Sequence, residues 1–172
     1  MYETGQLVVY GTTGVCRVEG TGTPDLKGVT KLYYFLRPLY QDGVIYAPVD
    51  SEKVPIRPVI SREEAERLVA LIPSLHVQAC HGRTLQQLAQ HYQSIVQTSD
   101  CRELMELTMS IYAKRQEAEQ QKHRLGIVDE KYMRQAERLL HGELSAALGI
   151  PYDQVPDFIA SHVGRSAQRP AQ

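Results

Sequence analysis

The spacing of apolar residues changes once along this chain, near Pro58–Ser61, and this change constrains the fold more than any other feature. Before it, apolar and polar residues alternate in short runs such as Val15–Glu19, as half-buried strands require. After it, apolar residues recur every three or four positions, which is the spacing of an amphipathic helix. The sequence therefore predicts an α+β chain, with a β-rich N-terminal unit followed by an all-helical unit.

The N-terminal unit, residues 1–60, has the short strands and close turns of a small antiparallel barrel of the SH3-like or Tudor-like kind. The pair Asp42-Gly43 is a strong hairpin signal between two of these strands. The expected strands are Leu7–Tyr10, Val15–Glu19, Leu32–Leu36 and Val44–Pro48, with a last extended piece between Pro48 and Pro55.

The helical unit is expected to span residues 61–164, with 165–172 as a flexible tail. Capping pairs mark three helix starts, because a Ser, Thr or Asp side chain accepts a hydrogen bond from the backbone three residues later. These pairs are Ser61 with Glu64, Thr84 with Gln87, and Asp100 with Glu103. The third helix is expected to run to about residue 123, with Tyr112 among its apolar positions. Asp129 is expected to cap a fourth helix that ends at Gly149, and a fifth is expected over Val155–Val163.

Composition limits the class of protein. The formal net charge is −1, so no global positive field draws the chain toward nucleic acid. The three cysteines are widely spaced, which favours reduced thiols in the cytoplasm over a disulfide framework. The chain has no run of about 18 apolar residues, so we expect no membrane span. Its first residues lack the pattern of a secretory signal. Its helices lack a sustained heptad repeat, which favours a monomer over a coiled-coil oligomer. We expect a cytoplasmic monomer.

The candidate motifs for chemistry are weak. Gly11–Gly14 follows a strand but lacks the lysine and hydroxyl residue of a phosphate-binding loop, so we interpret it as a turn. His76, Cys80 and His81 lie close together, but no second pair of ligands completes a zinc site. Cys80 and His81 are adjacent, whereas a nucleophile and its base are normally distant in sequence. The acidic pairs, Glu63-Glu64 and Asp129-Glu130, lie at helix starts, where they complement the helix dipole. We expect no catalytic residue, no metal and no cofactor.

A local basic surface is the remaining candidate for nucleic-acid binding. Lys131, Arg134 and Arg138 recur at positions that place them on one helical face, and Lys122 with Arg124 precede that helix. Such a face can neutralise several phosphates. Acidic residues are interspersed with these cations, so an ordinary solvated helix face is the alternative.

An ordered set of segments resembles the CarD family of bacterial transcription regulators. The first strand begins with a glycine and is rich in valine, and a turn with a second glycine follows it. A late helix begins with two acidic residues and a lysine and ends with the sequence Leu-Leu-x-Gly-Glu-Leu. These segments are Gly5–Tyr10, Gly14–Val18, Tyr33–Leu36, Pro48-Val49, Arg57–Ser61 and Asp129–Leu144.

The resemblance implies a barrel of the RNA-polymerase-interacting kind, which the transcription-repair coupling factor also carries. It would bind the polymerase β subunit through an exposed strand edge, for which the candidates are Val44, Ile45, Tyr46, Ala47 and Pro48. The helical unit would bind promoter DNA at the edge of the melted region and stabilise the open complex.

The chain departs from the family in three places. It has no tryptophan, and Leu85 stands at or beside the position of the family's minor-groove wedge. No Lys or Arg occurs in Leu85–Gln97, where the family helix is basic, and Tyr46 replaces an arginine of the docking strand. Leu85 shares its helical face with Leu88, so burial in the core is favoured over exposure as a wedge.

These departures leave three hypotheses. The first is a regulator that binds polymerase and promoter DNA. The second is a protein-interaction adaptor that has lost DNA binding. The third is an enzyme that uses Cys80 or the histidines.

Overall fold

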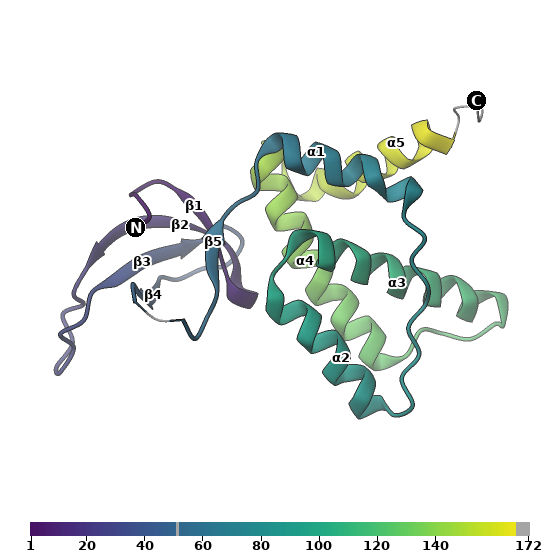
Figure 1. Cartoon of the computed structure of the whole chain (residues 1–172), viewed down its shortest axis with the longest axis horizontal. Coiled ribbons are helices and arrows are strands. Elements are labelled where there is room, and N and C mark those ends of the chain that lie inside the picture. Colours follow the sequence, from purple (N-terminus) through teal and green to yellow (C-terminus); the bar gives the residue numbers. More distant parts are fainter. Residues whose placement is uncertain (51, 168–172) are drawn as a thin grey trace. The chain divides into compact units, whose positions relative to one another are not determined.

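The computed structural model describes residues 1–50 and 52–167 and divides the chain into two compact units, Met1–Val59 and Ile60–Gln172 (Figure 1). We call them the β unit and the helical unit. The predicted α+β fold class is confirmed, because an antiparallel sheet precedes a helical region.

The β unit contains five strands in the order β4-β3-β2-β1-β5, and each pair of neighbours is antiparallel. Among the described residues, β4 and β5 each pair with a single neighbour, so the small antiparallel barrel expected here is an open sheet. The strands are β1 Leu7–Tyr10, β2 Gly14–Gly22, β3 Tyr33–Pro38, β4 Ile45–Pro48 and β5 Ile56–Pro58.

One face of the sheet forms the core of the β unit. Alternate strand residues point to this face, as the two-residue period of a strand requires. They are Val8, Cys16, Val18, Tyr34, Leu36 and Ala47. The glycine-rich segment after β1 forms a single 3-10 turn, Gly11–Thr13, between two antiparallel strands, as its interpretation as a turn predicts.

The helical unit is built around α4, which packs against α1, α2, α3 and α5. The three predicted caps are confirmed: Ser61, Thr84 and Asp100 accept hydrogen bonds from the third following backbone N–H at 3.1, 3.1 and 2.9 Å. The elements are α1 Arg62–Leu71, η2 Ile72–Ser74, α2 Leu85–Thr98, α3 Cys101–Gln120, α4 Ile127–Leu148, η3 Tyr152–Gln154 and α5 Val155–Ala167.

Three details of the helical unit differ from expectation. α4 begins at Ile127 after Gly126, so the prediction that Asp129 caps this helix is wrong. Tyr112 on α3 is 53% exposed rather than part of the core. α5 extends to Ala167, so the first residues of the expected tail 165–172 are helical, and residues 168–172 lie outside the described part of the chain.

Candidate docking strand and nucleic-acid interface

The free edge of β4 exposes backbone hydrogen-bonding groups at Tyr46. Val49 N donates to Leu32 O at 3.1 Å, and the next opposed pair is Pro48 with Tyr33. Because bonded and non-bonded pairs alternate along an antiparallel ladder, the N–H and C=O of Tyr46 point away from β3. Pro48 faces the same way and has no N–H, as is usual for proline on an edge strand. A donor and an acceptor at Tyr46 are therefore available to a further strand.

The side chains of β4 alternate between the core and the outer face. Ala47 is 2% exposed and points into the core, whereas Tyr46 is 51% exposed and packs edge-on against Phe35, with ring centroids 5.3 Å apart. Under Phe35 lie Gly20 and Gly22, where an added Cβ would meet its ring at 3.8 and 3.5 Å. On the outer face beside the free edge, Tyr46 and Phe35 therefore form an aromatic pair, and Phe35 packs over two glycines of β2. Of the five predicted docking residues, Val44 alone precedes β4 rather than lying in it.

Leu85 is the first residue of α2 and is 71% exposed, so the expectation that it belongs to the core is wrong. Its direction around the helix axis matches that of Leu88 and Tyr92, which are buried. Leu85 lies about 10 Å before Tyr92 along α2, at 1.5 Å per residue. Tyr92 bonds Asp129, the third residue of α4, so α4 begins too late to cover Leu85. The side chain is free to contact a ligand.

Asp129 is the centre of a buried polar cluster that joins three helices. The hydroxyl of Tyr92 on α2 donates to Asp129 Oδ1 at 2.6 Å, and Lys114 Nζ on α3 donates to the same oxygen at 3.0 Å. Burial, followed by the Asp129 carboxylate, raises the pKa of Tyr92 well above its usual range. The ammonium neutralises the carboxylate, so the cluster stabilises the packing of α2, α3 and α4 and adds no net charge to this end of the unit.

The predicted basic residues lie on α4 and on the segment before it. Lys131 and Arg134 are exposed and Arg138 is half-buried on α4, while Lys122 and Arg124 are exposed between α3 and α4. Lys131 Nζ lies 5.3 Å from the ring centroid of Tyr132, and a cation over an aromatic face is stabilised there. The α4 cations share one side of the helix, interspersed with Glu130 and Glu137.

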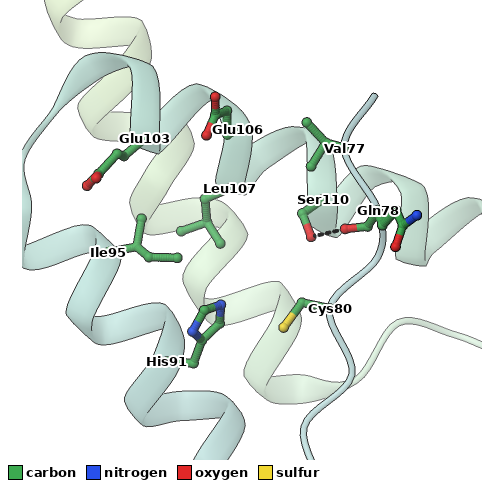
Figure 2. Close-up of a pocket in the computed structure, with 9 residues that line it drawn as sticks. All are labelled: Val77, Gln78, Cys80, His91, Ile95, Glu103, Glu106, Leu107 and Ser110. Carbon is green, nitrogen blue, oxygen red and sulfur yellow. Dashed lines mark hydrogen bonds between the residues drawn. The ribbon is translucent and has the colours of Figure 1, made fainter. Parts of the chain in front are cut away.

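A separate cleft of about 310 Å³ lies under the segment that precedes α2 (Figure 2). Ser110 on α3 holds that segment by donating to Gln78 O at 2.8 Å. Cys80 lines the cleft, whereas His81 pairs with Glu117 at 3.2 Å, so these neighbours have different partners. In the described residues no three or more metal-ligating side chains converge. Of the histidines, His91 on α2 also lines this cleft (Figure 2).

Sequence reasoning missed three features of these sites: the partners of Asp129, the aromatic pair on the outer face of the sheet, and the exposure of Ile127. Each depends on which element packs against which, and no local motif encodes that. The exposed cation Arg83 was also missed, because it precedes α2 and so belongs to no helical face.

In the part of the chain that the structure describes, no helix is long and apolar enough to cross a membrane. A search of curated proteins finds no match to the chain. The family model described as the CarD-like/TRCF RID domain matches residues 2–60, which is nearly the whole β unit. This match confirms the resemblance over those residues: the β unit is a CarD-like/TRCF RID domain, which is an RNA-polymerase-interacting domain of transcription-related proteins.

Proposed function

We propose that this chain is a non-enzymatic regulator of bacterial transcription. Its β unit binds the β subunit of RNA polymerase through the free edge of β4, and its helical unit contacts promoter DNA and modulates the stability of the open complex. The observation that carries the proposal is the coincidence of a CarD-like/TRCF RID domain at residues 2–60 with an accessible strand edge in that domain.

Docking by strand addition accounts for the polymerase contact. A partner strand gains main-chain hydrogen bonds from an unpaired edge, and side chains beside that edge provide specificity. At β4 the outward backbone groups of Tyr46 supply the bonds, and the ring of Tyr46 on Phe35 supplies an apolar contact.

The docking experiment uses the full chain and purified β subunit. Tyr46→Pro removes the outward N–H at a position where an edge strand tolerates proline, and Tyr46→Ala keeps the N–H but removes the ring. We expect Tyr46→Pro to bind more weakly than Tyr46→Ala, with both variants folded by circular dichroism. Equal binding by Tyr46→Pro and the wild type would exclude strand addition at this edge.

DNA contact is supported by Leu85 and by the cations of α4. An exposed apolar side chain can enter a weakened base step, and Lys131 with Arg134 can bind the flanking phosphates. We expect retardation of a forked promoter duplex that weakens steeply with salt, and a reduction of the salt slope by about 1 for Lys131→Gln.

The adaptor hypothesis remains a second candidate, because α2 contains no Lys or Arg and the formal net charge of the chain is −1. An adaptor would bind polymerase with no gain in affinity for DNA, whereas the proposed regulator binds DNA more tightly when polymerase is present. An enzymatic role predicts that Cys80→Ala with His81→Ala abolishes cellular function, and we expect this double variant to retain it.

A further inference from the structure

We propose that the cleft under the segment before α2 is a binding site for an alkylguanidinium, which is a planar cation on a short apolar body. A free small molecule or the side chain of an arginine can supply this chemistry. The site belongs to the helical unit and shares no residue with the docking strand, with Leu85 or with the cations of α4. It is therefore a ligand site beyond those that the proposed function uses.

The cleft is formed by three elements that meet around one space (Figure 2). It has a volume of about 310 Å³, and pockets for small ligands begin at about 300 Å³. The segment before α2 contributes Val77, Gln78 and Cys80, α2 contributes His91 and Ile95, and α3 contributes Glu103, Glu106, Leu107 and Ser110.

The segment that covers the cleft, residues 75–84, is held in place without a ligand. Ser110 Oγ donates to Gln78 O at 2.8 Å and ties the middle of the segment to α3. Gly82 lies so close to α2 that an added Cβ would meet Leu88 Cβ at 2.9 Å. A ligand therefore enters a site that is already formed and loses little affinity to the ordering of the protein.

Apolar side chains line part of the cleft and can cover the body of a ligand. Leu107 is 3% exposed, and Val77 and Ile95 are half-buried. An alkyl group placed against them is removed from water, which is favourable. The methylene groups of an arginine side chain can do the same while its charged end stays near the surface.

The charges of the cleft favour a cation. Glu103 and Glu106 line it, and none of the nine described residues that line it is Lys or Arg. Arg102 pairs with Glu106 at 3.2 Å from outside the cleft, and the Glu106 side chain is 41% exposed, so its carboxylate can accept further bonds. His91 adds an imidazole, which in its neutral form accepts one hydrogen bond. A guanidinium presents several N–H donors in one plane and is more weakly hydrated than an ammonium, so it suits a carboxylate beside apolar side chains.

Cys80 provides a direct readout of occupancy. It lines the cleft and is half-buried, whereas Cys16 and Cys101 are buried. The measurement is the rate at which iodoacetamide alkylates Cys80 in the full chain, followed by mass spectrometry of the digested protein. Three probes share an apolar body and differ in charge: hexylguanidinium, hexanol and hexanoate. Two capped tripeptides, Ala-Arg-Ala and Ala-Gln-Ala, test a protein side chain as the ligand.

We expect hexylguanidinium at ten times its Kd to slow the alkylation of Cys80 about ten-fold, because about one-tenth of the clefts are then empty. Hexanol should protect less, and hexanoate least. Glu103→Gln combined with Glu106→Gln should weaken the protection about ten-fold, since each exposed ion pair contributes about three-fold in affinity. Glu119→Gln, which removes an exposed acid of α3 outside the cleft, is the matched control and should behave as the wild type. Rates with and without probe are compared within each variant, so a change in the reactivity of the thiol itself cancels.

The two sources of the guanidinium are distinguished by the order of affinities. Protection by the Ala-Arg-Ala tripeptide at lower concentrations than hexylguanidinium would assign the site to an arginine of another protein, and the reverse order to a free ligand; both orders support the inference. Equal protection by hexanol and hexylguanidinium, undiminished protection in the Glu103 and Glu106 double variant, or no protection by any guanidinium would overturn it. The assay contains neither polymerase nor DNA, so these outcomes leave the proposed function standing.

Discussion

The hydroxyl of Tyr92 donates a hydrogen bond of 2.6 Å to Oδ1 of Asp129, and this bond joins α2 to the first turn of α4. Lys114 Nζ donates to the same oxygen at 3.0 Å, so α2, α3 and α4 meet at one carboxylate. The cluster therefore ties the first turn of α4 to α2 and to α3.

Loss of the Asp129 carboxylate should destabilise the helical unit strongly. Asp129→Ala leaves the Lys114 ammonium, whose side chain is 15% exposed, without its partner, and breaking a buried ion pair costs about 3–5 kcal/mol. Tyr92→Phe removes one hydrogen bond to a charged group and should cost about 1.5–3 kcal/mol. Urea unfolding followed by far-ultraviolet circular dichroism measures both. Glu130→Ala, the exposed neighbour, is the control and should change stability by less than about 1 kcal/mol. Equal stabilities of Asp129→Ala and Glu130→Ala would contradict the role of the cluster.

The stability of the β unit should decrease in alkaline solution because of Cys16. Burial raises the pKa of its thiol from 9.0 to about 11. The unfolded chain then loses this proton at lower pH than the folded chain. The protonated thiol therefore makes its full contribution to the free energy of unfolding below pH 9, and this contribution is lost as pH rises from about 9 to about 11. Unfolding of Cys16→Ala compared with wild type at pH 8 and pH 10.5 measures the difference. The difference in free energy of unfolding between the two proteins should be smaller at pH 10.5 than at pH 8. A difference that does not change with pH would contradict the raised pKa of Cys16.

Gly11 should not tolerate a side chain. Its φ is +46°, and an added Cβ would lie 2.6 Å from Val54 Cγ1. We expect Gly11→Ala to cost about 1–3 kcal/mol, from the left-handed backbone and the clash together. Gly28→Ala is the matched control, because Gly28 also has a positive φ, +82°, but has open space around it. In equilibrium unfolding, Gly11→Ala should have a clearly lower free energy of unfolding than Gly28→Ala. Similar losses of stability in the two variants would show that the contact with Val54 is unimportant.

Polymerase docking should depend little on salt. Tyr46 stands where the family places an arginine, and its uncharged ring packs on Phe35 at the free edge of β4. Strand addition with an apolar contact lacks the exposed charge pairs that salt screens. Affinity for the β subunit measured between low and high salt should change little for the wild type and more for Tyr46→Arg. A steep salt dependence in the wild type would point to a charged docking surface elsewhere.

The sequence predicted the features that depend on local chemistry. Three helix caps are examples, at Ser61, Thr84 and Asp100. Each side chain accepts a hydrogen bond from the backbone N–H three residues later, so the cap depends on nearby sequence and not on tertiary packing. The strand Val44–Pro48 was also located nearly to the residue, because turn residues border it on one side and proline limits it on the other.

Features that depend on tertiary packing could not be read from the sequence. Leu85 has the period of the buried stripe, but α4 begins too late to cover it. Asp129 has the composition of a helix cap, but Gly126 occupies that position and Asp129 is enclosed with Tyr92 and Lys114. Periodicity gives the direction of a side chain and does not say where the neighbouring helix starts.

The most direct test of the central proposal is the affinity of the full chain for a pre-melted promoter fragment, with and without RNA polymerase, across a salt series. We expect tighter binding when polymerase is present, a salt dependence that Lys131→Gln reduces, and loss of the polymerase-dependent gain in Tyr46→Pro. Polymerase binding with no gain in affinity for DNA at any salt concentration would contradict the proposed function and identify the chain as an adaptor.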